Sequence, residues 1–379
     1  MGVVVGPREI IQFGTILMMI LPGFYWIIIN SRRFSETESV ESRGEDFDVT
    51  IMIPMRNEIS NVERKLDSII PEIIGDDSVK LLLIESCSTD GTGQAAREFL
   101  ERCELPNHRW QVRTLDIPGK SIAINRAMEE ISSDIIIMTD ADAMVYPGWL
   151  EIVIENLSRE GIGVVSGLEE VGDSSSNFGK QYRTRSNVLR EKESRNGSTT
   201  VLEGSIIAWK VQSLGEFNLD EGLNADDAQI CFRSIRLGNR AIVDPRITFR
   251  DFEHEKRTFF ESVRRSQGLS RVLIRNADLV FSSRKGVPRW SVLNSILTYV
   301  ILPWAATVFA LNALLSISYG FSIAFNWPSI SLLMILLIFL FPLGRALFVG
   351  IIVSIIAHVQ ISLGKSHHNW EPSREPIQQ

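Results

Sequence analysis

The chain has 379 residues, which is enough for one large domain or two smaller ones. Hydrophobic residues make up 45% of it and its mean hydropathy is +0.08, but these averages hide two very apolar ends around an ordinary middle. The net charge of −7 is unevenly distributed and identifies no partner, and we expect no nucleic-acid partner. The three cysteines, Cys87, Cys103 and Cys231, show neither disulfide nor metal-site spacing, which suits a reducing compartment.

The N-terminal segment has the length and composition of a membrane anchor. Almost every residue from Ile10 to Ile29 is apolar, which is enough to cross about 30 Å of hydrocarbon as a helix. A cleaved signal peptide is the alternative. However, Arg8 and Glu9 make a poor basic leader, and no small-residue cleavage site follows the apolar run. We therefore expect residues 1–34 to form an uncleaved transmembrane anchor.

The middle of the chain, residues 35–250, alternates between strand and helix patterns after a polar linker at its start. Strands are expected at Val49–Ile53, Leu81–Ile84, Gln111–Leu115, Asp134–Thr139, Val201–Trp209 and Arg240–Val243. Helices are expected at Asn61–Ile70, from Ala95 to near Arg102, from Lys120 to about Ile131, and from Asp226 to Leu237. Such alternation predicts an α/β domain with right-handed βαβ units and a mostly parallel sheet.

Two carboxylates follow the most apolar of these strands. The uninterrupted run Ile135 to Met138 is typical of a strand buried on both faces, and it ends in Thr139-Asp140-Ala141-Asp142. In an open α/β sheet, ligands bind beyond the carboxyl ends of the strands. Oxygen ligands crowded there favour a hard cation such as Mg²⁺ or Mn²⁺. The alternative is a loop with two solvated aspartates.

Other charged residues lie near the same predicted sheet edge. The chain contains neither a P-loop nor a dinucleotide fingerprint, so a bound nucleotide would depend on carboxylates, a metal and Lys120, which follows Pro118-Gly119. A solvated lysine at a helix start is the alternative interpretation. Asp226 and Asp227 begin a predicted helix, where they either complement the helix dipole or perform chemistry.

The C-terminal part is expected to lie on and in a membrane. Residues 251–290 are basic and would contact lipid headgroups or phosphates. Residues 291–364 would form three spans, at Val292–Ile317, Phe321–Phe341 and Leu347–Leu363, with a kink at Pro303, a tight hairpin at Pro342–Arg345 and a polar tail at 365–379. The basic residues beside the spans then place residues 35–250 in the cytoplasm by the positive-inside rule; they are Arg32, Arg33, Arg284, Lys285 and Arg289.

Taken in order, these motifs resemble those of the family 2 glycosyltransferases, in particular membrane-bound members such as ceramide glucosyltransferase and the polysaccharide synthases. The resemblance implies a nucleotide-diphospho-sugar transferase (GT-A) fold and inversion at the anomeric centre. It implies donor contacts by Pro54, Glu58, Glu85, Lys120 and Asp140, a metal on Asp142 with Asp140, an acceptor contact at Gly204, and a general base at Asp227 with Asp226 second.

Gln267 to Val272 is similar to the Q-x-x-R-W motif of the membrane-bound synthases, with the arginine displaced by one position and Val272 where an aromatic residue is expected. Polymer synthases of the family generally hold the new sugar on that tryptophan. The resemblance implies that the diphosphate or an acceptor phosphate is contacted by residues of this segment, namely Arg264, Arg265, Gln267 and Arg271. A solvated basic rim is the alternative.

The expected function is therefore inverting transfer of a hexose from a nucleotide-diphosphate sugar, with Mg²⁺ or Mn²⁺, to a lipid or lipid-linked acceptor at the cytoplasmic face of the cell membrane. A UDP-sugar is the favoured donor and a GDP-sugar the alternative. A processive polysaccharide synthase and a non-catalytic scaffold with a decayed transferase domain are the other interpretations. A sugar nucleotidyltransferase would carry a glycine- and basic-rich loop after the first strand, and Met55-Arg56-Asn57-Glu58 is not such a loop.

Overall fold

An eight-stranded sheet lies at the centre of the computed structural model, which describes residues 7–31, 47–170, 177–251, 259–284, 286–318 and 342–365. The strands lie in the order β3-β2-β1-β4-β7-β6-β8-β5. Those of the first half pair in parallel, as predicted, and are β1 (Val49–Met55), β2 (Val79–Ser86), β3 (Trp110–Leu115) and β4 (Ile135–Thr139).

The second half of the sheet is mixed. It contains β5 (Ala143–Val145), β6 (Ile162–Glu169), β7 (Ile206–Lys210) and β8 (Arg240–Asp251). Strand β7 runs antiparallel to both β4 and β6, β8 is parallel to β6, and β5 is antiparallel to β8. The strand expected from Val201 is shorter than predicted, because residues 201–205 form a loop that lies beside the end of β4.

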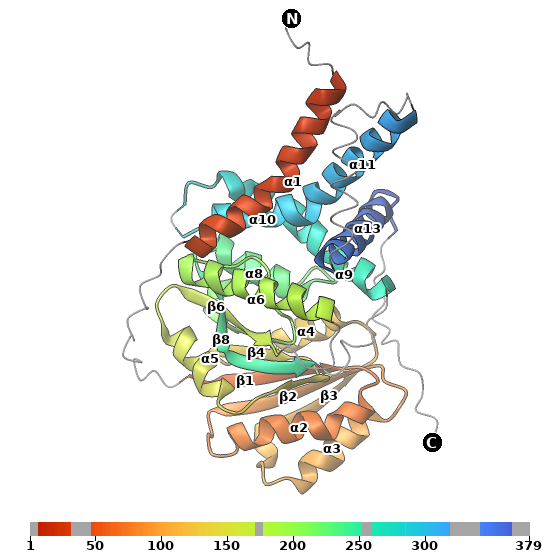
Figure 1. The fold of residues 1–379 in the computed structure, drawn as a ribbon. Coiled ribbons are helices and arrows are strands. Elements are labelled where there is room, and N and C mark those ends of the chain that lie inside the picture. The colour runs from red at the N-terminus through yellow and green to blue at the C-terminus, as the bar shows by residue number, and fades with distance from the viewer. Residues whose placement is uncertain are drawn as a thin grey trace, which may run out of the picture.

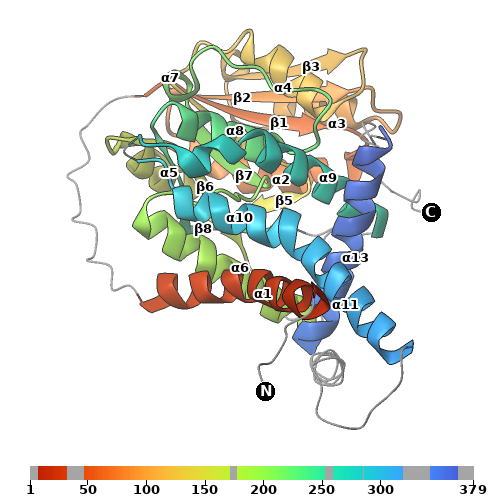
Figure 2. The same ribbon diagram turned by 90° about the horizontal axis from the view of Figure 1, so that it is seen from above.

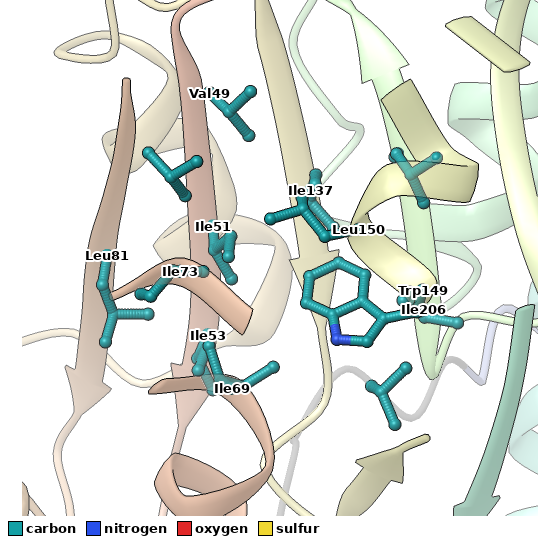
Figure 3. Packing of buried hydrophobic residues seen from close by; sticks show 14 of the residues in the cluster. Val49, Ile51, Ile53, Ile69, Ile73, Leu81, Ile137, Trp149, Leu150 and Ile206 are labelled. Carbon is teal, nitrogen blue, oxygen red and sulfur yellow. The ribbon is translucent and has the colours of Figure 1, made fainter. Parts of the chain in front are cut away.

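Alternation along β4 divides the core between the two faces of the sheet. Ile135 and Ile137 join one cluster, and Ile136 and Met138 join the other. The first face is covered by α2 (Ile59–Ile73), α3 (Thr92–Arg102) and α5 (Trp149–Ser158), and Figure 3 shows the Trp149 indole packed near Ile137 and Ile206. The opposite face carries α4 (Lys120–Met128), α8 (Asp226–Arg236) and α9 (Phe259–Arg275), with α6 (Asn177–Asn196) above the sheet in Figure 1.

Strand β1 continues through Pro54, where the sequence predicted its end. Its pairing with β4 stops at Met52, whereas its pairing with β2 continues to Met55. Proline has no N–H to donate, so it is tolerated where one side of the ladder has already ended. The remaining short helices are η1 (Asn107–Arg109), α7 (Val211–Leu214) and η3 (Ala277–Phe281).

Apolar helices extend from the side of the domain that carries α6 and α8 (Figure 1). They are α1 (Pro7–Ser31), the continuous run α10 (Arg289–Ile296), η4 (Leu297–Ile301) and α11 (Leu302–Ser318), and α13 (Pro342–Ser362). Two stretches, Ile10–Ser31 and Arg289–Leu315, are long and apolar enough to cross a membrane, while the apolar part of α13, Leu347–Ser362, is shorter. Figure 2 shows α1 beside α11, and α13 packs on α9 and α11.

The structure of the apolar helices differs from the sequence prediction at two prolines. Pro342–Arg345 was expected to be a tight hairpin but forms the first turn of α13, a position that proline favours because its missing N–H would have no helical partner there. At Pro303, where the sequence predicts a kink, the structure has a π-helical turn, η4, just before the proline. The predicted span Phe321–Phe341, the linker 35–46 and the tail beyond Lys365 lie outside the described residues.

Candidate active site

The turn after β4 carries the first pair of acids at the sheet edge. The backbone N–H of Asp140 and the hydroxyl of Thr139 both donate to the carbonyl of Ser205, at 3.2 and 2.8 Å. Ala141 is buried against the core, while Asp140 and Asp142 on either side of it are partly exposed. The turn therefore presents its two carboxylates at the carboxyl end of β4, where the sequence predicted them.

Lys120 connects this turn to the second pair of acids. Its Nζ lies 2.8 Å from Asp140 Oδ1 and 2.9 Å from Asp226 Oδ2. Burial opposes the charged form of Lys120, but the two carboxylates outweigh that effect and raise its pKa. The solvated-lysine alternative is therefore wrong: Lys120 is a largely buried cation between two acidic segments.

Asp226 and Asp227 begin α8, and neither caps it, because Ala225 occupies the N-cap position. Asp227 Oδ1 accepts the N–H of Ala228 at 2.7 Å. Burial, followed by the charge of Asp226, raises the pKa of Asp227 to about 7, although Ala228 and Lys120 act in the opposite direction. A carboxyl with such a pKa is suited to exchange a proton near neutral pH.

Gly204 lies beside this acid pair. A Cβ atom at Gly204 would be 3.7 Å from Cβ, Cγ and Oδ2 of Asp227, which is ordinary contact distance. The preceding residue, Glu203, forms an ion pair with Arg190 of α6, and its negative charge contributes to the raised pKa of Asp227. The structure thus brings Gly204, predicted to be near the acceptor, next to the predicted base.

The loops after β1 and β2 form the other side of the edge. Asn57 and Cys87 both have left-handed backbones, with φ of 54° and 52°, so each strand ends in a sharp turn. The Asn57 N–H donates to Ser88 Oγ at 3.0 Å, and the Thr89 N–H donates to Asn57 Oδ1 at 2.8 Å. These bonds fasten the two loops to each other.

The predicted donor residues are all buried: Pro54 near the end of β1, Glu85 near the end of β2, and Glu58 in the loop after β1. Glu58 accepts from the Asn61 amide at 2.9 Å, and its N–H donates to Thr92 Oγ1 at 2.7 Å. Glu85 accepts the N–H of Ser88. The Glu85 carboxylate holds loop backbone in place, whereas the Glu58 carboxylate binds the Asn61 side chain. Contact of these residues with a donor base remains a prediction.

Helix α9 carries the predicted basic residues. Burial lowers the pKa of Arg264, and the charge of Arg265 lowers it further. The negative charges of Glu261 and Asp226 act in the opposite direction, so Arg264 lies within electrostatic range of Asp226. Arg265 is exposed. Arg271 Nη1 approaches the carbonyl of Gly222 at 3.4 Å. Gln267 is buried and donates its amide to Gln360 at 2.6 Å, so its described partner is the apolar helix α13.

Several residues that the sequence reasoning missed hold the site together. The buried Ser86 hydroxyl donates to the Ile117 carbonyl at 3.0 Å and accepts the Gly119 N–H at 3.2 Å, which fixes the turn before Lys120. Asn125 pairs with the backbone of Leu219, in the segment before α8. Gly268 of α9 packs so closely on the Asn224 carbonyl that a Cβ would lie 2.3 Å from its oxygen. Gly268 lies within the Gln267–Val272 stretch, but the motif assigned it no role.

The carboxylate oxygens at this edge of the sheet suit a hard divalent cation that a bound ligand also coordinates. Among the described residues, no three His, Cys, Asp or Glu side chains gather around one point. Asp140 and Asp142 offer carboxylate oxygens at an open edge, and magnesium-type ions are commonly held by one or two carboxylates together with substrate phosphates and water. The residues present therefore fit Mg²⁺ or Mn²⁺ bound together with a phosphate ligand.

Comparison with known proteins agrees with this geometry. Residues 50–216 match the family model described as glycosyl transferase family 2. The chain carries a family 2 glycosyl transferase domain. The match includes the Asp140–Asp142 turn and Lys120 and ends before the Asp226–Asp227 pair.

Among curated relatives, glycosyltransferase AglE of Haloferax volcanii is 26% identical over 125 residues, which are 32% of this chain and 39% of AglE. Poly-beta-1,6-N-acetyl-D-glucosamine synthase of Staphylococcus aureus is 20% identical over 233 residues, which are 60% of this chain and 55% of the synthase. The alignments therefore span about two fifths and about half of the relatives' lengths.

Among solved structures, the mannosyltransferase PcManGT of Pyrobaculum calidifontis, in complex with GDP-Man and Mn²⁺, superposes with a TM-score of 0.77. The match covers 94% of this chain and 100% of PcManGT, at 22% sequence identity. This likeness confirms the GT-A fold that the motifs implied.

Proposed function

We propose that this chain transfers one hexose, or a few, from a nucleotide-diphosphate sugar to a lipid or lipid-linked acceptor at the cytoplasmic face of the cell membrane, with inversion at the anomeric carbon. The observation that carries the proposal is the position of Lys120 between Asp140 and Asp226, next to Asp227. This arrangement connects a cation suited to a leaving diphosphate with carboxylates suited to accept a proton.

The leaving group needs positive charge. When the bond between the sugar and the phosphate breaks, negative charge develops on the diphosphate, and a positioned ammonium stabilises it most effectively in a site of restricted solvent access. Lys120 is such a group. Asp142, with Asp140, would hold Mg²⁺ or Mn²⁺, which when bound adds further positive charge at the diphosphate. A UDP-sugar is the favoured donor; GDP-mannose belongs in the test because PcManGT was solved with it.

The acceptor needs a base. In an inverting transfer, the acceptor hydroxyl attacks the anomeric carbon from the side opposite the diphosphate and loses its proton. Asp227 has the raised pKa and the position for this role, with Gly204 leaving space in front of its carboxyl group. Asp226 is the second candidate, although its ion pair with Lys120 keeps one of its oxygens engaged.

The apolar helices support a lipid-borne acceptor. The side chains of α1 are mostly exposed, Phe13 to 70%, as expected of a helix that faces lipid. Gln267 of α9 contacts α13, and Gly268 packs on the segment before the acid pair, so one helix touches both the membrane side and the site. Confining enzyme and acceptor to one membrane plane raises their effective concentration.

The Staphylococcus aureus relative supports a second candidate function, processive polysaccharide synthesis. Val272 argues against processive synthesis, because it occupies the position where the Q-x-x-R-W motif has an aromatic residue. Its side chain is 2% exposed and packs in the core beneath α8, so it offers no surface on which a sugar could stack. Transfer of one or a few sugars is therefore the favoured form.

The test uses the full chain in nanodiscs with membrane lipid extract, Mn²⁺ or Mg²⁺, and a panel of labelled UDP- and GDP-sugars. A short, organic-extractable glycolipid supports the proposal. Long polysaccharide that resists protease would indicate the synthase. Absence of both transfer and donor hydrolysis, in protein that folds normally, would favour the scaffold.

A further inference from the structure

Lys65 is a buried lysine beneath the acidic turn, and neither the motifs nor the proposed mechanism uses it. It lies on the apolar face of α2 with Val62, Leu66 and Ile69, in the core cluster between α2 and the sheet. Its exposed fraction is 2%. Lysine is almost never fully buried without specific partners, so its presence here needs a reason.

Its partners stand at both ends of the acidic turn. Lys65 Nζ lies 2.7 Å from Thr139 Oγ1, immediately before Asp140, and 2.5 Å from the carbonyl oxygen of Ala143, immediately after Asp142. The Thr139 hydroxyl in turn donates to the Ser205 carbonyl at 2.8 Å. One ammonium thus fastens both ends of the segment that carries the two carboxylates.

The electrostatics are consistent with this placement. Burial lowers the pKa of Lys65 to about 7, and the charges of Asp140 and Asp142 act against that decrease. A lysine with only a packing role would gain from replacement by an apolar side chain, because removing a buried charge avoids its desolvation. Lys65 instead lies where the negative potential of the turn offsets part of that desolvation.

We propose that Lys65 is a positioning residue for the cation site, which sets the spacing of Asp140 and Asp142 by holding the backbone on both sides of their turn. This inference rests on the proposed function, because it concerns the metal that the function requires. Groups that orient metal ligands from behind typically change metal affinity by about 10- to 100-fold when removed.

The experiment measures Mn²⁺ binding by electron paramagnetic resonance on the full chain, with UDP or GDP present, for wild type, Lys65→Met and Lys80→Met. Lys80 is an exposed lysine on β2 and serves as the matched control. We expect Lys65→Met to weaken Mn²⁺ binding by about 10-fold or more and Lys80→Met to match wild type. If Lys65 had only a structural role, Lys65→Met would change the melting temperature but not the Kd for Mn²⁺ of the folded protein.

Thr139→Val is the second variant: it removes one Lys65 bond and the Thr139–Ser205 bond, but it keeps Lys65 and its bond to the Ala143 carbonyl. It decides the question if Lys65→Met fails to fold: weaker Mn²⁺ binding supports the inference, and binding within twofold of wild type overturns it. If Lys65→Met folds and binds within twofold of wild type, the inference is also overturned. Absence of Mn²⁺ binding by wild type would instead overturn the metal-dependent function itself, and this inference with it.

Discussion

The ammonium of Lys120 lies 2.9 Å from Asp226 Oδ2. This contact joins the half of the site built on parallel strands to the half built on α8. Because Lys120 also contacts Asp140, its charge separates two acidic segments that would otherwise repel each other. The Lys120 side chain therefore stabilises the resting site, and we propose that it also contacts the diphosphate.

The first prediction concerns this lysine. Lys120→Met should reduce kcat by roughly 10²- to 10³-fold, the usual effect of losing one group that stabilises developing negative charge. Lys120→Arg should retain part of the activity, because it keeps the charge. Steady-state transfer assays with saturating donor measure both variants. Unchanged kcat in Lys120→Met would exclude a role at the leaving group.

The second prediction concerns the base. Asp227→Asn should leave donor binding intact and reduce transfer by roughly 10²- to 10⁴-fold, because it keeps the shape and removes the proton acceptor. With the pKa of Asp227 raised to about 7, the wild-type rate should rise with pH, reach half its maximum near pH 7 and level off above it. Donor titrations and a pH–rate profile test this. If Asp226→Asn is inactive and Asp227→Asn is active, Asp226 and not Asp227 is the base.

The third prediction concerns the metal. Asp142→Ala should abolish metal-dependent binding of the nucleoside diphosphate and preserve the fold, because Asp142 is at a partly exposed turn. Isothermal titration calorimetry with and without chelator measures the binding, and circular dichroism checks the fold. Equal binding by wild type and variant in both conditions would remove Asp142 from the metal site.

The fourth prediction concerns the junction between α1 and the domain. The Glu193 carboxyl of α6, 4% exposed, accepts from Tyr25 Oη of α1 and from Thr199 Oγ1, both at 2.8 Å. Burial raises the pKa of Glu193 to about 7 from its usual 4.5. The folded chain thus retains a proton that the unfolded chain loses, so stability should fall as pH rises from 4.5 to about 7 and then stay level.

The upper limit of that loss is about 3 kcal/mol. Thermal unfolding in detergent, followed by tryptophan fluorescence, should show Glu193→Gln losing less stability than wild type over this pH range. Glu191→Gln is the control, since Glu191 forms an ion pair with Arg195 on the same helix and is more exposed. If stability depends on pH in the same way in wild type and Glu193→Gln, the raised pKa of Glu193 is refuted.

The fifth prediction concerns topology. The basic flanks predict four spans, with the transferase domain in the cytoplasm. An impermeant thiol reagent applied to intact cells should therefore label a cysteine at Ser373 but not one at Ser35. Labelling at Ser35 would reverse the orientation.

Much of the site could be predicted because its signals are local. The apolar run Ile135 to Met138 specifies a buried strand, and the carboxyl ends of parallel strands meet at one edge, so Asp140, Asp142 and the loops after β1 and β2 had to lie together. The ordered motifs added the GT-A fold, which the superposition confirms. These inferences needed only residue pattern and chain direction.

The tertiary structure decided how distant segments meet. The antiparallel insertion of β7 between β4 and β6 places Gly204 against Asp227, and strand order has no local signature in the sequence. Lys120 could be identified as a charged helix-start residue, but its contact with Asp226 depends on how α4 and α8 pack on one face of the sheet. Lys65 reads as an interruption of an apolar helix face until the turn above it is placed. Periodicity encodes which side of an element is buried, whereas the partner on that side is set by packing across the whole sheet.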